Sequence, residues 1–506
     1  MAARTTVAVD LGAESGRVVL GRFDGARVAL TEVHRFPTPP RPHNGHLRWD
    51  LGRIWSEIQT GLAAAGTAAG TVDTVGVDAW GVDYGLLGRD GEPLGDPVSY
   101  RDPRTAGMVA EAAGLVGRDR LYLATGIQLL ELNTIFQLMA EARAGGLEQA
   151  DRLLLIPDLF HRLLSGAAVA EYTVASTTGA YDMAAGRWAT ALLEELGVPT
   201  HLLPEVVDAG TDLGPVRPDL PGHAAARVIA PPSHDTASAV VGVPLADPDA
   251  AYISSGTWSL VGVETRKPVI NQAAMAANLT NEGGAYGTIR LLRNNTGMWL
   301  LQESRRQWSR EGREHSYEEL VRLATAAPAG VSIFNADHPD FLAPGDLPAR
   351  IRAYCGRTGQ PVPETMPALV RSMLDSLALA YRSTVDDLAA VTGRPATAVH
   401  IVGGGSRNHL LNQAVADVTG LPVIAGPVEA TALGNICVQL IALGDVADLS
   451  QAREVVRASA GPELRSFDPS PADQLAALVG RYRDLVAADR PPERRPIPVG
   501  RRKEGP

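Results

Sequence analysis

Two segments of the chain share one pattern of alternating hydrophobic and polar positions. Residues 7–10 alternate, residues 11–16 are mostly small or polar, and residues 17–20 return as an apolar run. Residues 251–263 repeat this shape around Ser254-Ser255-Gly256-Thr257. Alternation with a period of two predicts strands, and small residues between them predict a tight turn. Two such hairpins suggest two domains of similar architecture, and the shape alone leaves open whether they arose by internal duplication or are two unrelated hairpins.

Helical and strand patterns alternate through the rest of the chain. Helical spacing predicts helices over residues 51–69, 127–144, 157–164, 368–391 and 408–418, and short β-branched runs predict strands over 72–78, 228–230, 399–402 and 422–425. This alternation is typical of an α/β protein. Pro244 and Pro248 interrupt the pattern. We therefore expect an N-terminal domain over 1–244, a C-terminal domain over 245–470, and a final helix with a Pro/Arg-rich, disordered tail over 471–506.

Composition narrows the classes of function. The 506 residues carry a net charge of −11, which disfavours binding to nucleic acid, and the only dense basic run lies in the tail at 494–503. Two cysteines, Cys355 and Cys437, argue against a disulfide scaffold or a cysteine metal site. Neither an apolar leader nor a run of about 18 apolar residues occurs. We expect a cytoplasmic enzyme that binds no membrane and is a monomer or homodimer.

Lysine is almost absent. Only Lys267 and Lys503 occur, and neither lies in a P-loop, in a protein-kinase lysine motif, or in a context that suits a pyridoxal-phosphate enzyme. The chemistry must therefore rest on carboxylates, backbone amides and arginine.

The two hairpin turns are candidate phosphate-binding loops. A tight turn can direct several backbone N–H groups into one concavity, which suits a phosphate, and Asp10 at the end of the first strand can hold Mg²⁺ directly or through water. The alternative is a pair of ordinary hairpins with a turn-stabilising aspartate. Two facing loops, one from each domain, are stronger evidence than either loop alone.

Gly403-Gly404-Gly405 follows the predicted strand 399–402 and precedes a predicted helix. Glycines let a backbone approach a ligand closely, so the run favours a nucleotide site over a flexible connection. Ser233-His234-Asp235-Thr236 similarly follows a strand and begins a helix. Asp235 is a candidate general base or metal ligand, with helix capping as its alternative role.

Two polar and aromatic clusters suit a sugar, which needs hydrogen bonds and an aromatic surface. They are Trp80-Gly81-Val82-Asp83 and the segment 100–104, which reads Tyr-Arg-Asp-Pro-Arg. Taken alone, they are better explained by a half-buried tryptophan and a surface ion pair.

Together these segments resemble the FGGY carbohydrate kinases over nearly the whole chain, and within that family the branch that phosphorylates L-rhamnulose. The residues that carry the resemblance are VAVDLGAESGRV (7–18), GVDAWGVDYGLL (76–87), YRDPRT (100–105), EYTVASTTGAYD (171–182), SHDTASAV (233–240), AAYISSGTWSLVG (250–262), NLTNEGGA (278–285), HIVGGGSRNHLLNQ (400–413) and VIAGPVEATALGN (423–435).

The resemblance implies two RNase H-like, actin-like domains that flank a central cleft. It implies transfer of a phosphate from ATP, with Mg²⁺, to the 1-hydroxyl of L-rhamnulose, with Asp235 as the base. Matching positions imply sugar contacts by Gly81, His234, Asp235, Thr236 and Asn294. They imply nucleotide contacts by Ala13, Glu14, Ser15, Gly16, Arg17, Thr257, Gln302 and Gly404.

Glu14 departs from the family pattern, because many relatives have serine or threonine there. Its carboxylate would repel phosphate unless it faced Mg²⁺ or Arg17. The alternatives in function are a kinase for another ketose or deoxy-sugar, such as L-fuculose or D-xylulose, and a non-catalytic actin-like ATP-binding protein. Asp235 and the sugar cluster argue against the second alternative.

Overall fold

Two mixed β-sheets, one from each half of the chain, organise the structure, a computed structural model that describes residues 4–220, 225–470 and 476–489. The first sheet has the order β13-β14-β6-β1-β2-β3, formed by β13 (Asp212–Pro215), β14 (Arg227–Ile229), β6 (Thr74–Ala79), β1 (Arg4–Leu11), β2 (Ser15–Phe23) and β3 (Val28–Pro37). The second has the order β17-β18-β16-β15-β19-β20-β21, formed by β17 (Thr280–Gly283), β18 (Ile289–Thr296), β16 (Trp258–Thr265), β15 (Ala251–Ser255), β19 (Val399–Val402), β20 (Val423–Ala425) and β21 (Arg465–Phe467).

The two sheets share one arrangement of strands. In the first, β1 pairs antiparallel with β2 and parallel with β6, and in the second β15 pairs antiparallel with β16 and parallel with β19. Each sheet continues with a further parallel strand, β14 or β20, and then with an antiparallel strand, β13 or β21. Both predicted hairpins are confirmed, and the shared order favours duplication over coincidence.

Helices cover these sheets and fill the space between them. In the first half they are α1 (Leu51–Ala69), α2 (Met108–Val116), α3 (Arg118–Thr125), α4 (Thr134–Arg143), α5 (Ile156–Ser165), α6 (Tyr172–Ala175), α7 (Thr190–Glu195) and α8 (Asp235–Val241). In the second half they are α9 (Gln272–Ala276), α10 (Trp299–Arg310), α11 (Tyr317–Thr325), α12 (Leu347–Arg357), α13 (Met366–Thr392), α14 (His409–Thr419), α15 (Ala430–Ala442), α16 (Leu449–Ala460) and α17 (Val479–Asp489). Short strand pairs complete the fold: β4 (Arg41–His43) with β5 (His46–Arg48), β7 (Tyr84–Leu87) with β8 (Arg152–Leu155), β9 (Ala170–Glu171) with β12 (Val206–Val207), and β10 (Tyr181–Asp182) with β11 (Arg187–Trp188).

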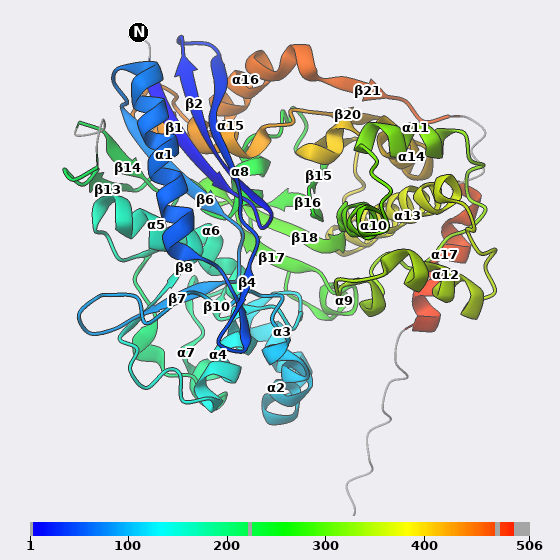
Figure 1. Cartoon of the computed structure of the whole chain (residues 1–506), viewed down its shortest axis with the longest axis horizontal. Coiled ribbons are helices and arrows are strands. Elements are labelled where there is room, and N and C mark those ends of the chain that lie inside the picture. Colours follow the sequence, from blue (N-terminus) through cyan, green and yellow to red (C-terminus); the bar gives the residue numbers. More distant parts are fainter. Residues whose placement is uncertain (1–3, 221–224, 471–475, 490–506) are drawn as a thin grey trace, which may run out of the picture.

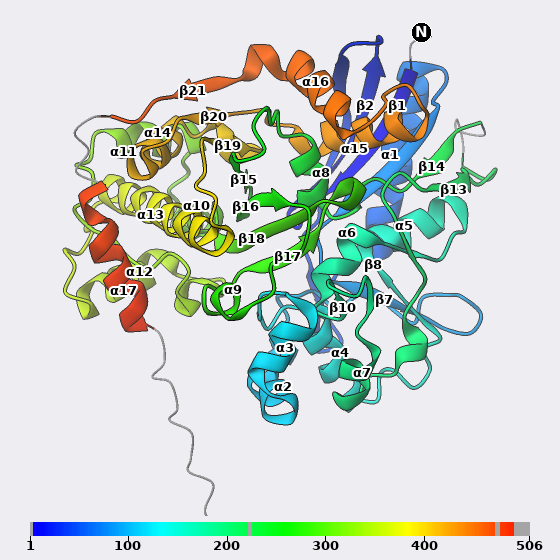
Figure 2. The ribbon, with the colours of Figure 1, turned by 180° about the vertical axis from the view of Figure 1, so that it is seen from behind.

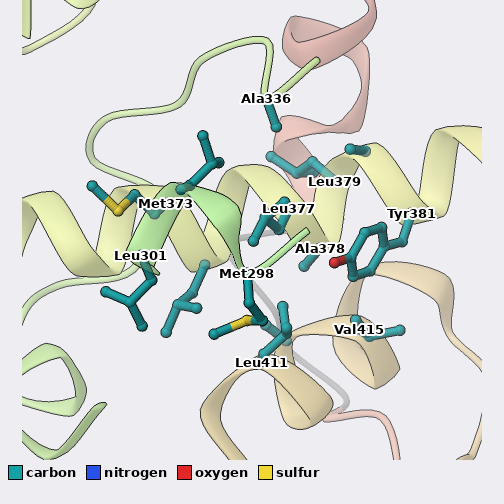
Figure 3. Packing of buried hydrophobic residues seen from close by; sticks show 14 of the residues in the cluster. Met298, Leu301, Ala336, Met373, Leu377, Ala378, Leu379, Tyr381, Leu411 and Val415 are labelled. Carbon is teal, nitrogen blue, oxygen red and sulfur yellow. The ribbon is translucent and has the colours of Figure 1, made fainter. Parts of the chain in front are cut away.

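The long helix α13 shows how local sequence sets the limits of an element. The Thr365 hydroxyl accepts a hydrogen bond from the Ala368 N–H at its start, and Gly393 ends it with φ of 70°. Its buried face packs with α10 and α14 in the largest core of the second half (Figure 3). This packing holds α10, which carries Gln302, at a fixed place beside the second sheet.

A helix from late in the chain returns to the first sheet. Helix α15 packs on α8 and on β1 and β6, and its core with α16 includes Ala8, Val19 and Val241. Figures 1 and 2 show α15 beside α8 in both views. The boundary near residue 244 thus separates the two sheets in chain order but not all of the helices that cover them, and it stays a prediction.

The structure bears on four expectations: one helix boundary, the two cysteines, membrane-spanning helices and the tail. The helix expected over 127–144 begins only at Thr134, because the Asn133 side chain accepts from the Leu130 N–H and closes a turn before it. Cys355 and Cys437 are both buried and free. No helix among the described residues is long and apolar enough to cross a membrane. The tail beyond Asp489 lies outside the described residues.

Candidate active site

A cavity of about 380 Å³ lies where the turns of both hairpins meet. Its walls include the first turn at residues 12–15, the second turn at 254–257, the segment 234–236 and Gly403-Gly404. The predicted site residues that line it are Asp10, Ala13, Glu14, Ser15, Arg17, Gly81, His234, Asp235, Thr236, Thr257, Asn294, Gln302 and Gly404. Residues distant in sequence therefore form one site, as the resemblance implies.

Gly16 is the predicted residue that does not line the cavity. A Cβ atom placed on Gly16 would lie 2.5 Å from Cζ of Phe36, to which Gly16 is paired in the sheet. Its lack of a side chain therefore serves the packing of β2 against β3. A contact between Gly16 and a nucleotide stays a prediction.

Arg17 is held between two carboxylates at one side of the cavity. Its Nε and Nη2 donate to Oδ2 of Asp10 at 2.8 and 2.6 Å, and its Nη1 forms an ion pair with Glu429. These two carboxylates therefore already balance the positive charge of the Arg17 guanidinium. Arg17 can bind a phosphate strongly only when another cation takes over one of these carboxylates.

A group of carboxylates surrounds Asp10. Asp78 lies behind the cavity wall, where burial raises its pKa, the charges of Asp10 and Asp235 raise it further, and the hydrogen bond from Asn435 opposes the rise. Carboxylate oxygens are the donors that Mg²⁺ prefers, and that ion commonly keeps several waters. No group of three or more metal-ligating side chains occurs among the described residues. The site therefore fits an ion held by Asp10, water and substrate phosphates, rather than by a cage of protein ligands.

Asp235 is the first residue of α8 and lies at the cavity wall with its side chain 29% exposed. Its Oδ1 accepts from the Thr236 N–H at 2.5 Å and from the Thr236 hydroxyl at 3.2 Å. Burial raises its pKa, the neighbouring His234 lowers it, and the charge of Asp10 raises it. A raised pKa makes the carboxylate a stronger proton acceptor.

The capping alternative for Asp235 does not match this geometry. The residue at the N-cap position of α8 is His234, and its side chain makes no capping hydrogen bond. The Asp235 carboxylate instead bonds to the neighbouring residue, Thr236. A first-turn carboxylate does favour the helix dipole, but an uncharged asparagine would keep most of the local structure.

The other end of the cavity suits a polyol. Trp80 and Tyr100 line it beside Gly81, as the sequence cluster suggested. The Asn294 backbone N–H and side-chain Nδ2 donate to Gln128 Oε1 at 3.0 and 3.1 Å, a contact that joins β18 to the first half of the chain. Polar and aromatic groups thus face the space next to Asp235.

Asp83, a member of the same sequence cluster, lies behind this wall rather than in it. Its carboxylate is fully buried and accepts from Trp49, Trp80, Gln137 and the Tyr100 backbone. Burial raises its pKa to about 6. Asp83 therefore supports the aromatic wall and does not contact a ligand in the cavity.

Sequence reasoning missed several polar lining residues: Gln128, Asn133, Thr177, Thr280, Glu282 and Thr431. Gln128 and Asn133 fell inside the expected helix 127–144, so their place in a turn was hidden. Glu282 lies within the quoted segment 278–285, but nothing in its spacing indicates an inward-facing carboxylate.

The triple glycine contains three different environments. Gly403 has φ of 81°, which favours glycine, and a Cβ on Gly405 would lie 2.0 Å from Oγ of Ser255. A Cβ on Gly404 would meet nothing within 4 Å, and Gly404 lines the cavity. Two glycines thus serve the fold, while Gly404 leaves space open for a ligand. Nearby, Oε1 of Gln302 is buried without a hydrogen-bond partner among the described residues.

Glu14 finds a partner that the sequence did not predict. Its carboxylate forms an ion pair with Arg306 on α10, whereas the partners of Arg17 are Asp10 and Glu429. On the same helix, Trp299 stacks against the Arg101 guanidinium at 4.3 Å. These contacts join the two halves of the chain at the mouth of the cavity.

The family comparison agrees with this arrangement. The N-terminal domain model of the FGGY family of carbohydrate kinases matches residues 5–242, and the C-terminal domain model matches residues 251–443. The chain belongs to the FGGY family of carbohydrate kinases. It is therefore a sugar kinase, and its cavity lies between the regions matched by the two FGGY domains.

Individual relatives of this FGGY kinase are similar over almost its full length. It is 43% identical to a rhamnulokinase of Pectobacterium carotovorum over 97% of this chain and 99% of the relative. It is 41% identical to a rhamnulokinase of Bacteroides thetaiotaomicron over 91% and 95%. Its fold is similar to that of a xylulose kinase from Lactobacillus acidophilus, with a TM-score of 0.78 and 17% identity, over 96% of this chain and 97% of the other. Its fold is also similar to that of a xylulose kinase from Rhodospirillum rubrum, with a TM-score of 0.73 and 21% identity, over 96% of this chain and 98% of the other.

Proposed function

We propose that this kinase transfers the γ-phosphate of ATP, with Mg²⁺, to the 1-hydroxyl of L-rhamnulose. The products are L-rhamnulose 1-phosphate and ADP, and the reaction belongs to L-rhamnose catabolism. The substrate is proposed from the rhamnulokinase relatives, at 41–43% identity over nearly the whole chain. The observation that carries the reaction type is that Asp235 lies in one cavity with the turns of both hairpins.

In the proposed reaction, Asp235 accepts the proton of the 1-hydroxyl as the sugar oxygen attacks the γ-phosphorus. A bond forms between that oxygen and phosphorus, the bond to the bridging oxygen of ADP breaks, and the proton moves to the carboxylate. Phosphoryl transfer depends on positioning and charge neutralisation more than on covalent help. A carboxylate base, two amide-lined turns and Mg²⁺ are sufficient, so the scarcity of lysine is no obstacle.

The two proposed substrates bind at different ends of the cavity. We place the sugar beside Trp80, Gly81 and Asn294, and the nucleotide beside Thr257, Gln302 and Gly404. Gln302 has a free acceptor in Oε1, which an amino group of the base or a sugar hydroxyl of the nucleotide can satisfy.

Asp10 would hold Mg²⁺ through water, and the ion would neutralise charge on the phosphates. Arg17 now balances the negative charge of Asp10. A bound Mg²⁺ would balance part of that charge, and Arg17 would then supply a second positive charge to the phosphates. We place the enzyme in the cytoplasm, as a monomer or homodimer that binds neither nucleic acid nor membrane.

The proposal is tested by measuring ADP release with purified protein, ATP, Mg²⁺ and a panel of ketoses. We expect kcat/KM for L-rhamnulose to exceed that for L-fuculose and D-xylulose by at least about tenfold, or about 1.4 kcal/mol. Product analysis should place the phosphate on the 1-position. Equal or faster turnover of either other ketose would contradict the substrate, and absence of sugar-dependent ADP release would contradict the activity.

A further inference from the structure

A chain of buried charged groups connects the second sheet to the proposed base. Arg290, on β18, is fully buried, and its Nε donates to the Gly283 carbonyl at 2.8 Å. Its Nη1 lies 3.1 Å from Oε2 of Glu282, and its Nη2 lies 3.1 Å from Nδ1 of His234. The other ring nitrogen of His234, Nε2, lies 3.4 Å from Oδ1 of Asp235. The ion pair between Arg290 and Glu282 is thus connected to Asp235 through the imidazole of His234.

The contact with Arg290 favours one tautomer of His234 over the other. A guanidinium has five N–H donors, has no acceptor, and stays protonated in proteins. Nδ1 also lies 3.4 Å from Oε2 of Glu282, a carboxylate that would accept a proton from it. The shorter contact, 3.1 Å from Arg290, which can only donate, favours Nδ1 as the acceptor and places the ring proton on Nε2. The backbone of His234 is also fixed, because its N–H donates to the Thr173 hydroxyl at 3.1 Å. The imidazole consequently presents an N–H group toward Asp235.

This arrangement treats the two oxygens of Asp235 differently. The Thr236 N–H, the Thr236 hydroxyl and the Nε2–H group of His234 all surround Oδ1. Oδ2 has no hydrogen-bond partner among the residues that the structure describes. A carboxylate oriented by donors on one oxygen leaves the other free for the incoming proton.

We propose that Arg290 is a positioning residue for the base. Through His234 it holds the Nε2–H tautomer, whose proton faces Oδ1 of Asp235 and turns Oδ2 toward the sugar hydroxyl. This inference rests on the proposed role of Asp235 in phosphoryl transfer.

The chain of groups also joins the two halves of the molecule. His234 lies in the region matched by the N-terminal family domain, and Arg290 and Glu282 lie in the region matched by the C-terminal domain. The carboxylate orientation consequently depends on the two halves being packed as they are here. Separation of the halves would release His234 from Arg290 and leave both tautomers accessible.

The first test is a direct observation of the tautomer in the wild-type protein. Long-range ¹H–¹⁵N spectra of ¹⁵N-histidine-labelled protein distinguish protonated from unprotonated ring nitrogens, and the His234→Gln variant assigns the signals. We expect a protonated Nε2 and an unprotonated Nδ1 in His234. A protonated Nδ1, in either the other neutral tautomer or an imidazolium, would overturn the proposal. This measurement does not depend on turnover, so it stays decisive if the proposed substrate is wrong.

The second test removes the ion pair as a unit, so that no buried charge is left unpaired. In the double variant Glu282→Gln/Arg290→Met, we expect kcat to fall at least about tenfold, while calorimetric Kd values for sugar and ATP stay within a few-fold. The ¹⁵N signals of His234 should move toward a mixture of tautomers. Unchanged signals with unchanged kcat would overturn the proposal, and so would a loss of sugar binding that matches the loss of kcat. If the double variant does not fold, the wild-type tautomer decides alone.

Discussion

Glu171 offers the sharpest test of how the fold holds the segment that carries Asp235. Its side chain is fully buried, and one oxygen, Oε2, accepts from the backbone N–H groups of Thr173, Val174 and Ser233 at 2.8, 3.2 and 2.9 Å. The same oxygen accepts from the Thr173 hydroxyl at 2.6 Å. Ser233 precedes His234, so this one carboxyl group connects β9 and α6 to the start of the 233–236 segment.

Replacing Glu171 with alanine should leave three buried backbone donors without an acceptor. Each such donor costs roughly 1–3 kcal/mol, so the free energy of unfolding should fall by at least about 3 kcal/mol relative to Glu171→Gln, which keeps an acceptor oxygen in place. Neither variant titrates at this position, so that difference should not depend on pH. The alanine variant should also lose kcat, because the 233–236 segment loses its anchor.

Comparison of Glu171→Gln with wild type isolates the proton. Burial raises the pKa of Glu171 to about 8, from an ordinary value near 4.5. Between these values the folded chain binds a proton that the unfolded chain has released. Wild-type stability is therefore fully present below about pH 4.5 and falls, by up to about 1.4 kcal/mol per pH unit, as the pH rises toward 8. Glu171→Gln lacks this slope, so its relative stability should grow with pH.

The assay is urea unfolding, followed by circular dichroism, at each unit from pH 5 to pH 8 for the three proteins. We expect a constant difference in the free energy of unfolding between the glutamine and alanine variants, and a difference between the glutamine variant and wild type that widens with pH. A glutamine variant as unstable as the alanine variant would refute the hydrogen-bond argument. A difference between the glutamine variant and wild type that stays flat across this range would refute the protonation argument.

Three further outcomes follow from the cavity. Gly404→Val should fold, since a Cβ there meets nothing within 4 Å, yet calorimetry should show at least tenfold weaker ATP binding with sugar binding retained; unchanged ATP affinity would make Gly404 a connector only. Glu14→Gln should change the free energy of unfolding by under about 1 kcal/mol, since its partner Arg306 is 42% exposed and stays paired with Glu303. It should lower the KM for ATP by removing a negative charge from the proposed phosphate site; a higher KM would contradict this. Excess chelator should abolish sugar phosphorylation and Mg²⁺ should restore it, whereas full activity in chelator would exclude the role given to Asp10.

Much of the architecture could be predicted from local patterns. The hairpin strands alternate or form apolar runs, α1 and α13 have long helical periodicity, and Gly393 ends the second of these helices. Such features depend on neighbours in sequence, which periodicity and capping describe. The place of α15 against the first sheet could not be predicted in this way, because its apolar residues show only that it is buried and not which sheet it covers.

In the candidate site, too, residues with a local sequence pattern could be predicted and partners distant in sequence could not. The turns, Asp235 and Gly404 stand out because small or acidic residues lie shortly after strands. Partners across the cavity could not be foreseen, such as Arg306 for Glu14 and Arg290 for His234. Those pairs are set by the packing of the two halves, and an arginine within a strand or helix carries no local sign of its distant partner.

The most direct test of the central claim is the kcat of Asp235→Asn with L-rhamnulose and ATP. Asparagine keeps the shape and the Oδ1 contacts of Asp235 but cannot accept the hydroxyl proton. A positioned base contributes roughly 10²–10⁴-fold, and the proton leaves late in a loose transition state, which favours the lower part of that range. We expect a folded variant that binds sugar and ATP within a few-fold of wild type and loses kcat by at least about 10². A folded variant that keeps more than about a third of wild-type kcat would contradict it.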